Sequence, residues 1–292
     1  MFAYVFFTHT IFPRLLQFFD QYDIIKKWSA IKFSSHRKGY DIMPSKYDKL
    51  NKVHELKNKL SELRPLNQGE LKRLREEFVI NNTYHSNAIE GSTLTLRETA
   101  LILQEGVTIA EKPIKEHLEA IGHKDAFDYV MELTDSKTAL SERVIKDIHS
   151  LVLMADRENK GIYRRVPVMI MGSEHTPPQP FLIPELMAEL VLDYNEKYGA
   201  ADIIELASEL HLRFESIHPF IDGNGRTGRL LLNFELMKCG LLPVNIKFTD
   251  RVKYYDSFDD YRRNNSVEAL ASLVADYEIQ ELQKYISIIE NE

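Results

Sequence analysis

Apolar residues recur three or four positions apart along most of the chain, which is the spacing of one face of an α-helix. The first such segment ends at Pro65, because proline cannot continue a helix, and its apolar residues are Leu50, Val53, Leu56, Leu60 and Leu63. The same spacing predicts helices over residues 71–91, 113–133, 141–155, 183–197, 201–217, 226–238, 251–263 and 266–285. Thr95 and Glu98 form a capping-box signature for a further helix after Gly91. The sequence therefore predicts an all-α fold.

One segment, RRVPVMIMGSEHTPPQP, departs from this helical pattern. Val166, Val168 and Ile170 alternate with other residues before a stretch rich in turn residues, Gly172 to Pro180. Alternation of this kind is typical of a half-buried strand. We expect a short strand or β-hairpin here.

Composition limits the classes of function. With 44% hydrophobic and 28% charged residues, the chain has the composition of a soluble globular protein. A net charge of −7 argues against coating of nucleic acid, so any polyanion must be bound locally. The single cysteine, Cys239, excludes an intrachain disulfide framework, and a reducing, cytoplasmic compartment is expected.

Residues 1–42 stand apart from the rest of the chain. Their aromatic-rich start lacks the basic region and the cleavage site of a signal peptide. Pro13 and Arg14 interrupt the apolar stretch well before the length of a membrane span, so we expect no membrane partner. Regular helical spacing begins only after MPSKYDKL. Residues 1–42 are therefore interpreted as an N-terminal extension, and whether Met43 is the natural start stays open.

The segment HPFIDGNGRTGR, residues 218–229, concentrates unusual chemistry. Pro219 disfavours helical geometry at His218, so the imidazole should lie at a helix end and face a loop. Gly223, Gly225 and Gly228 enter the next helix, and consecutive N–H groups in such a turn form an anion-binding site. The segment therefore predicts a phosphate site.

Two arginines strengthen this interpretation. Arg226 and Arg229 lie in the first turns of the next helix, where the helix dipole disfavours positive charge. A polyphosphate would satisfy both guanidiniums, and Asp222 can hold a Mg²⁺ ion that neutralises phosphate charge. Separately, a helix stop, a tight turn and a solvated arginine pair are ordinary structural features. Their coincidence indicates a nucleotide site, although a P-loop is excluded because no Lys-Ser/Thr follows the glycines.

Residues 218–229 resemble the motif of the Fic (filamentation induced by cAMP) family, HPFx(D/E)GN(G/K)RxxR, at every specified position. GIYRRVPVMIMGSEHTPPQP resembles the family's flap, and SNAIEGSTLT resembles its inhibitory motif, (S/T)xxxE(G/N). The resemblance implies a Fic-type helical bundle with a short β-hairpin flap beside the active site. It implies an N-terminal helical region with the inhibitory helix over residues 43–110 and a catalytic domain over 111–285. The implied activity is transfer of AMP from ATP to a Ser, Thr or Tyr hydroxyl of a target protein, with release of pyrophosphate.

The resemblance also implies roles for individual residues. His218 would be the general base, Asp222 would ligate Mg²⁺, and the glycine at 225 favours AMP transfer over phosphorylation. Tyr254 and Tyr255 match an aromatic pair that lines the family's nucleotide pocket, with ordinary packing as the alternative. The implied nucleotide-binding residues are Asp222, Gly223, Asn224, Gly225, Arg226, Thr227, Gly228, Arg229, Tyr254 and Tyr255.

The flap is implied to dock an extended segment of the target by strand addition, and a purely structural hairpin is the alternative. Main-chain pairing does not identify the target, so self-modification and a homodimer both stay open. The implied docking residues are Val168, Met169, Ile170, Met171, Gly172, Ser173, Glu174 and His175.

Ser86 and Glu90 lie four positions apart on one helical face, and Glu90 falls at a helix C-terminus, where the dipole disfavours a carboxylate. The resemblance implies that Glu90 pairs with Arg229 and keeps it from the γ-phosphate of ATP. This arrangement is that of class II, autoinhibited members. Two alternatives stay open: Glu90-dependent removal of AMP, and a non-catalytic nucleotide-sensing module, against which the intact His218 argues.

Overall fold

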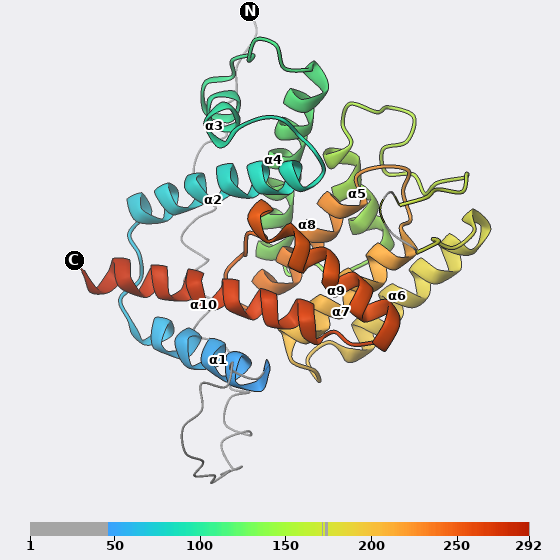
Figure 1. Cartoon of the computed structure of the whole chain (residues 1–292). Helices are drawn as coiled ribbons and strands as arrows, with labels where there is room; N and C mark the ends of the chain where they lie inside the picture. Colours follow the sequence, from blue (N-terminus) through green and yellow to red (C-terminus); the bar gives the residue numbers. More distant parts are fainter. Residues whose placement is uncertain (1–45, 171, 173–174, 292) are drawn as a thin grey trace, which may run out of the picture.

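The computed structural model describes residues 46–170, 172 and 175–291. These residues form helices and irregular segments only, so the all-α prediction is confirmed for the described chain (Figure 1). The α-helices are α1 (Lys46–Glu62), α2 (Gln68–Ile89), α3 (Leu96–Glu105), α4 (Ile114–Asp135), α5 (Glu142–Val152), α6 (Ile183–Lys197), α7 (Ile203–Ile217), α8 (Asn224–Lys238), α9 (Arg251–Asn264) and α10 (Glu268–Glu290). Two short 3₁₀ helices are η4 (Pro180–Leu182) and η5 (Phe248–Asp250).

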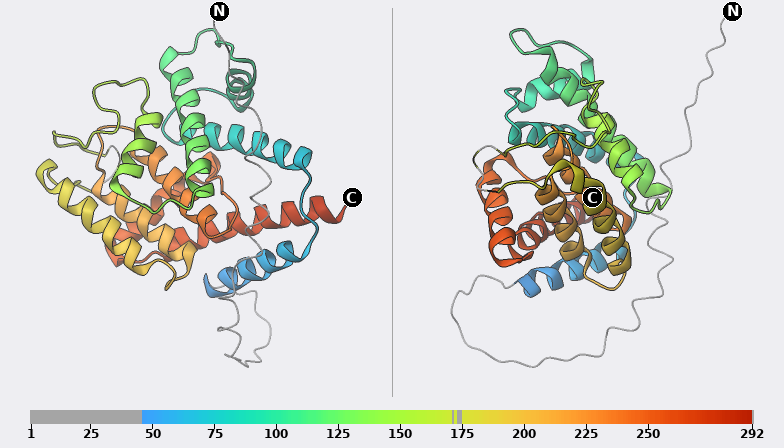
Figure 2. Two further views of the ribbon diagram at one scale, coloured as in Figure 1. Left: turned by 180° about the vertical axis from the view of Figure 1, so that it is seen from behind. Right: turned by 90° about the vertical axis from the view of Figure 1, so that its right-hand side faces the viewer.

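Helix α8 is the centre of the described structure. It packs against α7, α4, α5 and α2, while α1 and α10 lie side by side and α10 also packs against α7 (Figures 1 and 2). Leu230, Leu231 and Phe234 of α8 belong to one apolar cluster, whereas Leu232 and Leu236 belong to a second one. A helix that is buried on all sides is held in place by both clusters. The residues at its start are therefore fixed relative to the whole fold.

Helix boundaries follow the capping residues. Thr95 Oγ1 accepts a hydrogen bond from the Glu98 N–H at 3.2 Å, and the Glu98 carboxylate accepts one from the Thr95 N–H at 2.7 Å, as the capping-box signature predicts. Gly91 adopts a φ of 95° after the end of α2. Helix α8 starts at Asn224, inside the motif and two residues earlier than predicted, because Gly223 caps it with a φ of 77°.

The predicted β-hairpin is not found among the described residues between α5 and α6. Residues 162–170, 172 and 175–179 are irregular, and Met171, Ser173 and Glu174 lie outside the described residues. Prolines explain part of the difference, because they cannot donate to a β-ladder, and this short segment contains several. A side chain joins the two arms instead: the Arg164 guanidinium donates to the carbonyls of Val166 at 3.1 Å and Pro178 at 2.7 Å.

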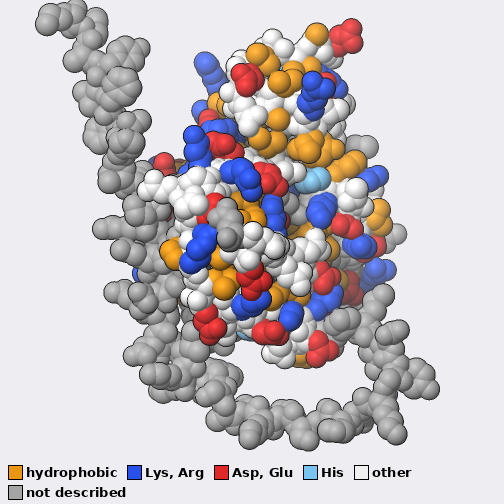
Figure 3. Space-filling model, turned by 90° about the vertical axis from the view of Figure 1, so that its left-hand side faces the viewer, with side chains coloured by type: hydrophobic (Ala, Val, Ile, Leu, Met, Phe, Trp, Pro, Cys, Tyr) orange, Lys and Arg blue, Asp and Glu red, His pale blue; other side chains and the backbone are white. Residues whose placement is uncertain are grey.

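The surface carries both signs of charge. Figure 3 shows Lys and Arg side chains interspersed with Asp and Glu over one face of the molecule. The predicted extension, residues 1–42, lies outside the described residues. None of the described helices combines the length and apolar character needed to span a bilayer.

Helix α10 carries a buried acid on its inner face. Glu278 is fully buried, and its Oε1 accepts a hydrogen bond from the Leu242 N–H at 2.9 Å. Its second oxygen has no hydrogen-bond partner within the described chain. Burial raises the pKa of Glu278 to about 8, although the nearby Lys57 acts in the opposite direction. The carboxyl is therefore largely protonated at neutral pH.

Replacing Glu278 by glutamine is expected to raise the melting temperature at pH 8 by about 2 °C or more, and to change it less at pH 5. The unfolded chain ionises this carboxyl near 4.5, so stability falls as the pH rises from there through the folded pKa of about 8. Glutamine can still accept from Leu242 and does not titrate. Thermal unfolding of both proteins at both pH values measures the effect, and an equal shift at the two pH values would contradict it.

Candidate active site

The turn between α7 and α8 is fixed by its own side chains. His218 ends α7 with a φ of 50°, and Gly223 begins α8 with a φ of 77°. Buried Phe220 lies between them, and the Asn224 side chain holds its main chain. Asn224 Oδ1 accepts from the Phe220 N–H at 2.9 Å, and Asn224 Nδ2 donates to the Phe220 carbonyl at 2.9 Å. The Asn224 side chain therefore shapes the loop. The N–H groups that begin α8 have no acceptor in their own helix and remain for an anion.

His149 of α5 supports this turn. Its ring stacks on Phe220 with a centroid distance of 3.6 Å, and its Nδ1 accepts from the Gly161 N–H at 2.9 Å. Because Nδ1 is the acceptor, Nε2 carries the proton and donates to the Asp222 carbonyl at 2.9 Å. Burial lowers the pKa of His149 to about 4, which keeps this tautomer neutral. Sequence analysis missed His149, since no local pattern connects it with the motif.

His218 is a mostly buried imidazole at the end of α7. Its side chain is 20% exposed, and burial lowers its pKa to about 4, with the nearby Arg164 acting in the same direction. Arg164 is buried and donates from Nε to the His218 carbonyl at 2.9 Å. The imidazole is therefore neutral near pH 7 and able to accept a proton.

Arg229 lies under the C-terminal end of α2, enclosed by acceptors. Its Nη2 pairs with Glu90 Oε1 at 2.7 Å and donates to the Ser86 carbonyl at 2.8 Å, while its Nε donates to Ser86 Oγ at 3.0 Å. The Arg229 side chain is 5% exposed, whereas that of Glu90 is 37% exposed. The structure thus brings Ser86 and Glu90, the two residues predicted to be inhibitory, together with the last arginine of the motif.

Arg226 is held in a similar way by α4. Its Nη1 pairs with Glu119 at 3.1 Å, and its Nη2 pairs with Asp222 at 3.3 Å. Lys115, one turn before Glu119, lies 3.7 Å from the other oxygen of Asp222. Asp222 remains half-exposed at the start of the turn. One accessible carboxylate beside an anion site suits Mg²⁺, which commonly binds one or two carboxylates together with phosphate oxygens.

Two glycines of α8 face different neighbours. A Cβ at Gly225 would overlap Glu90 Oε1, so this glycine lies against the Glu90 carboxylate. A Cβ at Gly228 would lie 2.8 Å from both Glu215 Oε1 and His211 Nδ1, on the side of α7. Thr227 is fully buried. Thr227 and Gly228 are buried in this arrangement and contribute to the packing of α8, and their part in nucleotide binding stays a prediction.

Tyr254 and Tyr255 have different surroundings. Tyr254 is buried, and its hydroxyl lies 2.7 Å from His211 Nε2 and 3.3 Å from Arg229 Nη1. Tyr255 is 44% exposed and donates to the Ile89 carbonyl at 3.2 Å. Tyr254 therefore packs in the core and supports Arg229 there, and its place in a nucleotide pocket stays a prediction. Tyr255 is accessible and tethers the end of α2.

The described flap residues lie next to this site. His175 donates from Nε2 to the Ser216 carbonyl at 2.8 Å, which joins the flap to the end of α7. Val168 and Ile170 are half-buried, while Met169 is 90% exposed.

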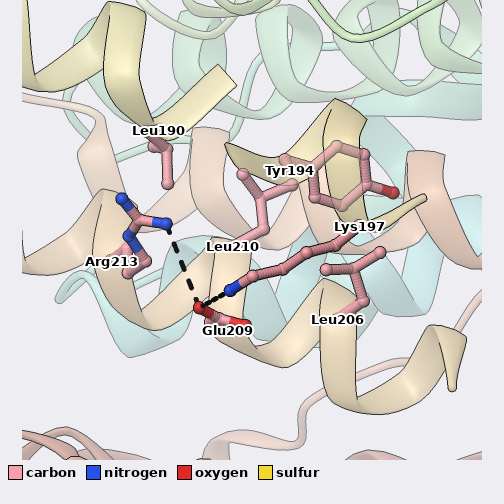
Figure 4. Close-up of a pocket in the computed structure, with 7 residues that line it drawn as sticks. All are labelled: Leu190, Tyr194, Lys197, Leu206, Glu209, Leu210 and Arg213. Atoms are coloured by element: carbon pink, nitrogen blue, oxygen red, sulfur yellow. Dashed lines mark hydrogen bonds and ion pairs between the residues drawn. The ribbon is translucent and has the colours of Figure 1, made fainter. Parts of the chain in front are cut away.

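A separate pocket between α6 and α7 is too small to be the site. Its volume of about 10 Å³ is close to that of one water position. Glu209 closes it through ion pairs with Lys197 at 2.7 Å and Arg213 at 3.9 Å (Figure 4).

Fold and site together describe a helical protein with an anion-binding helix start beside a neutral histidine. Residues 139–236 match the Fic/DOC family. The solved structure of Fic-1 from C. elegans has a TM-score of 0.75 and 30% identity, covering 84% of this chain and 73% of that one. A Fic domain containing signaling protein from Bacteroides thetaiotaomicron has a TM-score of 0.75 and 28% identity, covering 84% and 97%. The chain belongs to the Fic family.

Curated relatives extend beyond the shared region. Protein adenylyltransferase Fic of Nematostella vectensis is 37% identical over 214 residues, which is 71% of this chain and 48% of that protein. Protein adenylyltransferase fic-1 of Caenorhabditis briggsae is 34% identical over 241 residues, 81% of this chain and 46% of that protein. The chain thus spans about half the length of these relatives.

Replacing Gly228 by alanine is expected to destabilise the fold by about 1–3 kcal/mol, because the added methyl group meets buried atoms of α7. Gly69→Ala is the matched control: it lies near the start of α2, its Cβ would meet only the Asn67 side chain, at 3.2 Å, and no loss is expected. Urea unfolding of the three proteins measures the difference. Equal stability of Gly228→Ala and wild type would contradict the packing role.

Proposed function

We propose that the protein is an autoinhibited adenylyltransferase that moves AMP from ATP to a Ser, Thr or Tyr hydroxyl of a target protein. The observation that carries this proposal is the neutral His218 beside the N-terminus of α8. The names of the relatives support it, because the shared region contains the whole motif.

In the proposed reaction, His218 takes the proton of the target hydroxyl. The hydroxyl oxygen then bonds to the α-phosphorus of ATP, the bond from that phosphorus to the bridging oxygen breaks, and pyrophosphate leaves. A base with a pKa of about 4 is weak, but the phosphates beside it stabilise the imidazolium as it forms. Burial therefore keeps the imidazole unprotonated before ATP is bound.

The phosphate chain would be held by the N-terminus of α8 and by the two guanidiniums. Both arginines are already oriented by partners within the described chain, so little side-chain entropy is lost on binding. Mg²⁺ bound at Asp222 would neutralise part of the phosphate charge. Lys115 lies near enough to Asp222 to be displaced by that cation.

Inhibition follows from the place of the Glu90 carboxylate. It pairs with Arg229 and lies against Gly225 in the first turn of α8, where a phosphate would approach. A nucleotide bound there would meet both a filled space and a negative charge. Displacement of Glu90 would open the site.

A second candidate function is removal of AMP from a modified protein. Glu90 is more than one-third exposed, and its charge is near enough to raise the pKa of His218 against the effect of burial. A carboxylate so placed can orient a water molecule for hydrolysis. The flap would serve either reaction by docking the target, and the exposed side chains of Val166 and Met169 favour an extended apolar segment.

Replacing Glu90 by glycine is expected to raise self-modification at least about tenfold, since release of about 1.4 kcal/mol of competing interaction shifts an equilibrium by that factor. Transfer of label from α-labelled ATP, to the protein itself and to lysate proteins, measures it. Glu90→Gln is the matched control and should give an intermediate rate, because the amide still accepts from Arg229 without the charge.

Two further variants separate the roles in the Glu90→Gly background. His218→Ala should lose transfer yet still bind ATP, and Arg229→Ala should return transfer to the wild-type rate or below. Transfer unaffected by His218→Ala would refute the base. If wild type removes AMP and Glu90→Gly does not, hydrolysis is the correct activity.

A further inference from the structure

A buried carboxyl beside His218 has no part in the mechanism above. Glu215 lies one turn earlier on α7 and is 7% exposed, with its Oε2 3.8 Å from His218 Nδ1. His218 Nδ1 faces the main-chain carbonyl of Glu215 as well as its carboxyl without a well-formed hydrogen bond to either, and Glu215 Oε1 has no hydrogen-bond partner within the described chain. Buried polar atoms are nearly always bonded, so two neighbouring groups with open positions point to a contact made in another state.

The motif itself makes room for this carboxyl. Gly228 has no side chain where a Cβ would lie 2.8 Å from Glu215 Oε1, so α8 can approach α7 without displacing the acid. His211, one turn before Glu215, lies at the same contact and hydrogen-bonds Tyr254 through Nε2. Glu215 is thus enclosed between two helices at a fixed distance from His218.

The charge of Glu215 depends on the inhibitory residue. Burial, and after it the Glu90 carboxylate, raise the pKa of Glu215 to about 8, while Arg229 acts in the opposite direction. The carboxyl is therefore largely protonated near pH 7 when Glu90 is in place. The charged and titratable groups that face Glu215 are Glu90 of α2, His211 and His218 of α7, Arg229 of α8, and Tyr254, Tyr255 and Arg262 of α9.

We propose that Glu215 is a positioning residue for His218: its carboxylate accepts a hydrogen bond from Nδ1–H and leaves Nε2 free as the base, and the Glu90–Arg229 pair withholds it from this role. The inference rests on the proposed function, because it assigns a partner to that function's base.

The protonation state of Glu215 determines which nitrogen of His218 carries the proton. A neutral imidazole carries one proton, and a carboxylate at Nδ1 keeps that proton there and stabilises the imidazolium that forms during transfer. A protonated carboxyl instead donates to Nδ1, which leaves the proton on Nε2 and removes the base. When Glu90 leaves, a negative neighbour is lost while Arg229 remains near Glu215. Both changes favour the carboxylate, so one ion pair controls the phosphate site and the base together.

The test compares Glu90→Gly with the double variant Glu90→Gly, Glu215→Gln. Glutamine keeps the size of the side chain but cannot ionise. The double variant should transfer label at least tenfold more slowly at saturating ATP, with the KM for ATP within twofold. Glu90→Gly should lose activity as the pH falls through the pKa of Glu215, which lies below about 8 once the Glu90 charge is removed, and the double variant should lack this acid limb. Glu209→Gln, an acid on α7 that pairs with Lys197, is the matched control and should change neither quantity.

Nitrogen-15 NMR of the histidine rings gives a readout that does not need activity. At pH 7, His218 should carry its proton on Nδ1 in Glu90→Gly and not in wild type or the double variant, and its signals are identified by their loss in His218→Ala. If the double variant does not fold, Glu90→Gly, Glu215→Asp replaces it, and the acid limb should persist at a lower rate.

An unchanged rate, pH profile and tautomer in the double variant would overturn the role of Glu215. Absence of transfer by Glu90→Gly itself would instead contradict the proposed function. In that case the NMR measurement still tests whether Glu215 sets the tautomer of His218. The same Nδ1–H tautomer in all variants would contradict this role.

Discussion

The burial of two guanidiniums at the start of a central helix is the constraint on which the site depends. A buried positive charge without a partner is very costly, so each arginine of α8 needs a carboxylate from another part of the chain. Arg229 forms an ion pair with Glu90, at the C-terminal end of α2, and Arg226 forms one with Glu119 of α4. In the proposed function a polyphosphate would meet the same electrostatic requirement that these internal carboxylates meet here.

The rest of the fold holds α8, and with it the two arginines, in a fixed position. Helix α8 contributes to both apolar clusters, so it cannot shift to bring its arginines into contact with solvent. The turn before it is held by Asn224, His149 and Arg164, none of which touches the reacting groups through its side chain. Side chains at helix ends thus do the positioning, while the helices supply rigidity.

The sequence predicted features that lie within one stretch of chain, and it did not predict contacts between residues far apart in the sequence. Helical periodicity and caps identified the described helices, and the motif identified the turn, because each signal lies within one stretch of chain. The predicted hairpin is not found among the described residues, because alternation alone takes no account of prolines or of a guanidinium such as Arg164 that joins the arms. Glu119 and His149 come from other helices and leave no local trace. Glu215 could have been found from the sequence, because His211 and Glu215 lie one turn apart among the apolar residues of α7, in line with His218 at the end of the helix.

The absent side chain at residue 225 has an evolutionary consequence. Any larger residue there collides with the Glu90 carboxylate as it lies in this structure. Lysine at this position, which the family motif permits, would therefore require Glu90 to be lost or moved at the same time. The residue type at position 225 and the place of the Glu90 carboxylate are in this way coupled through one atom position.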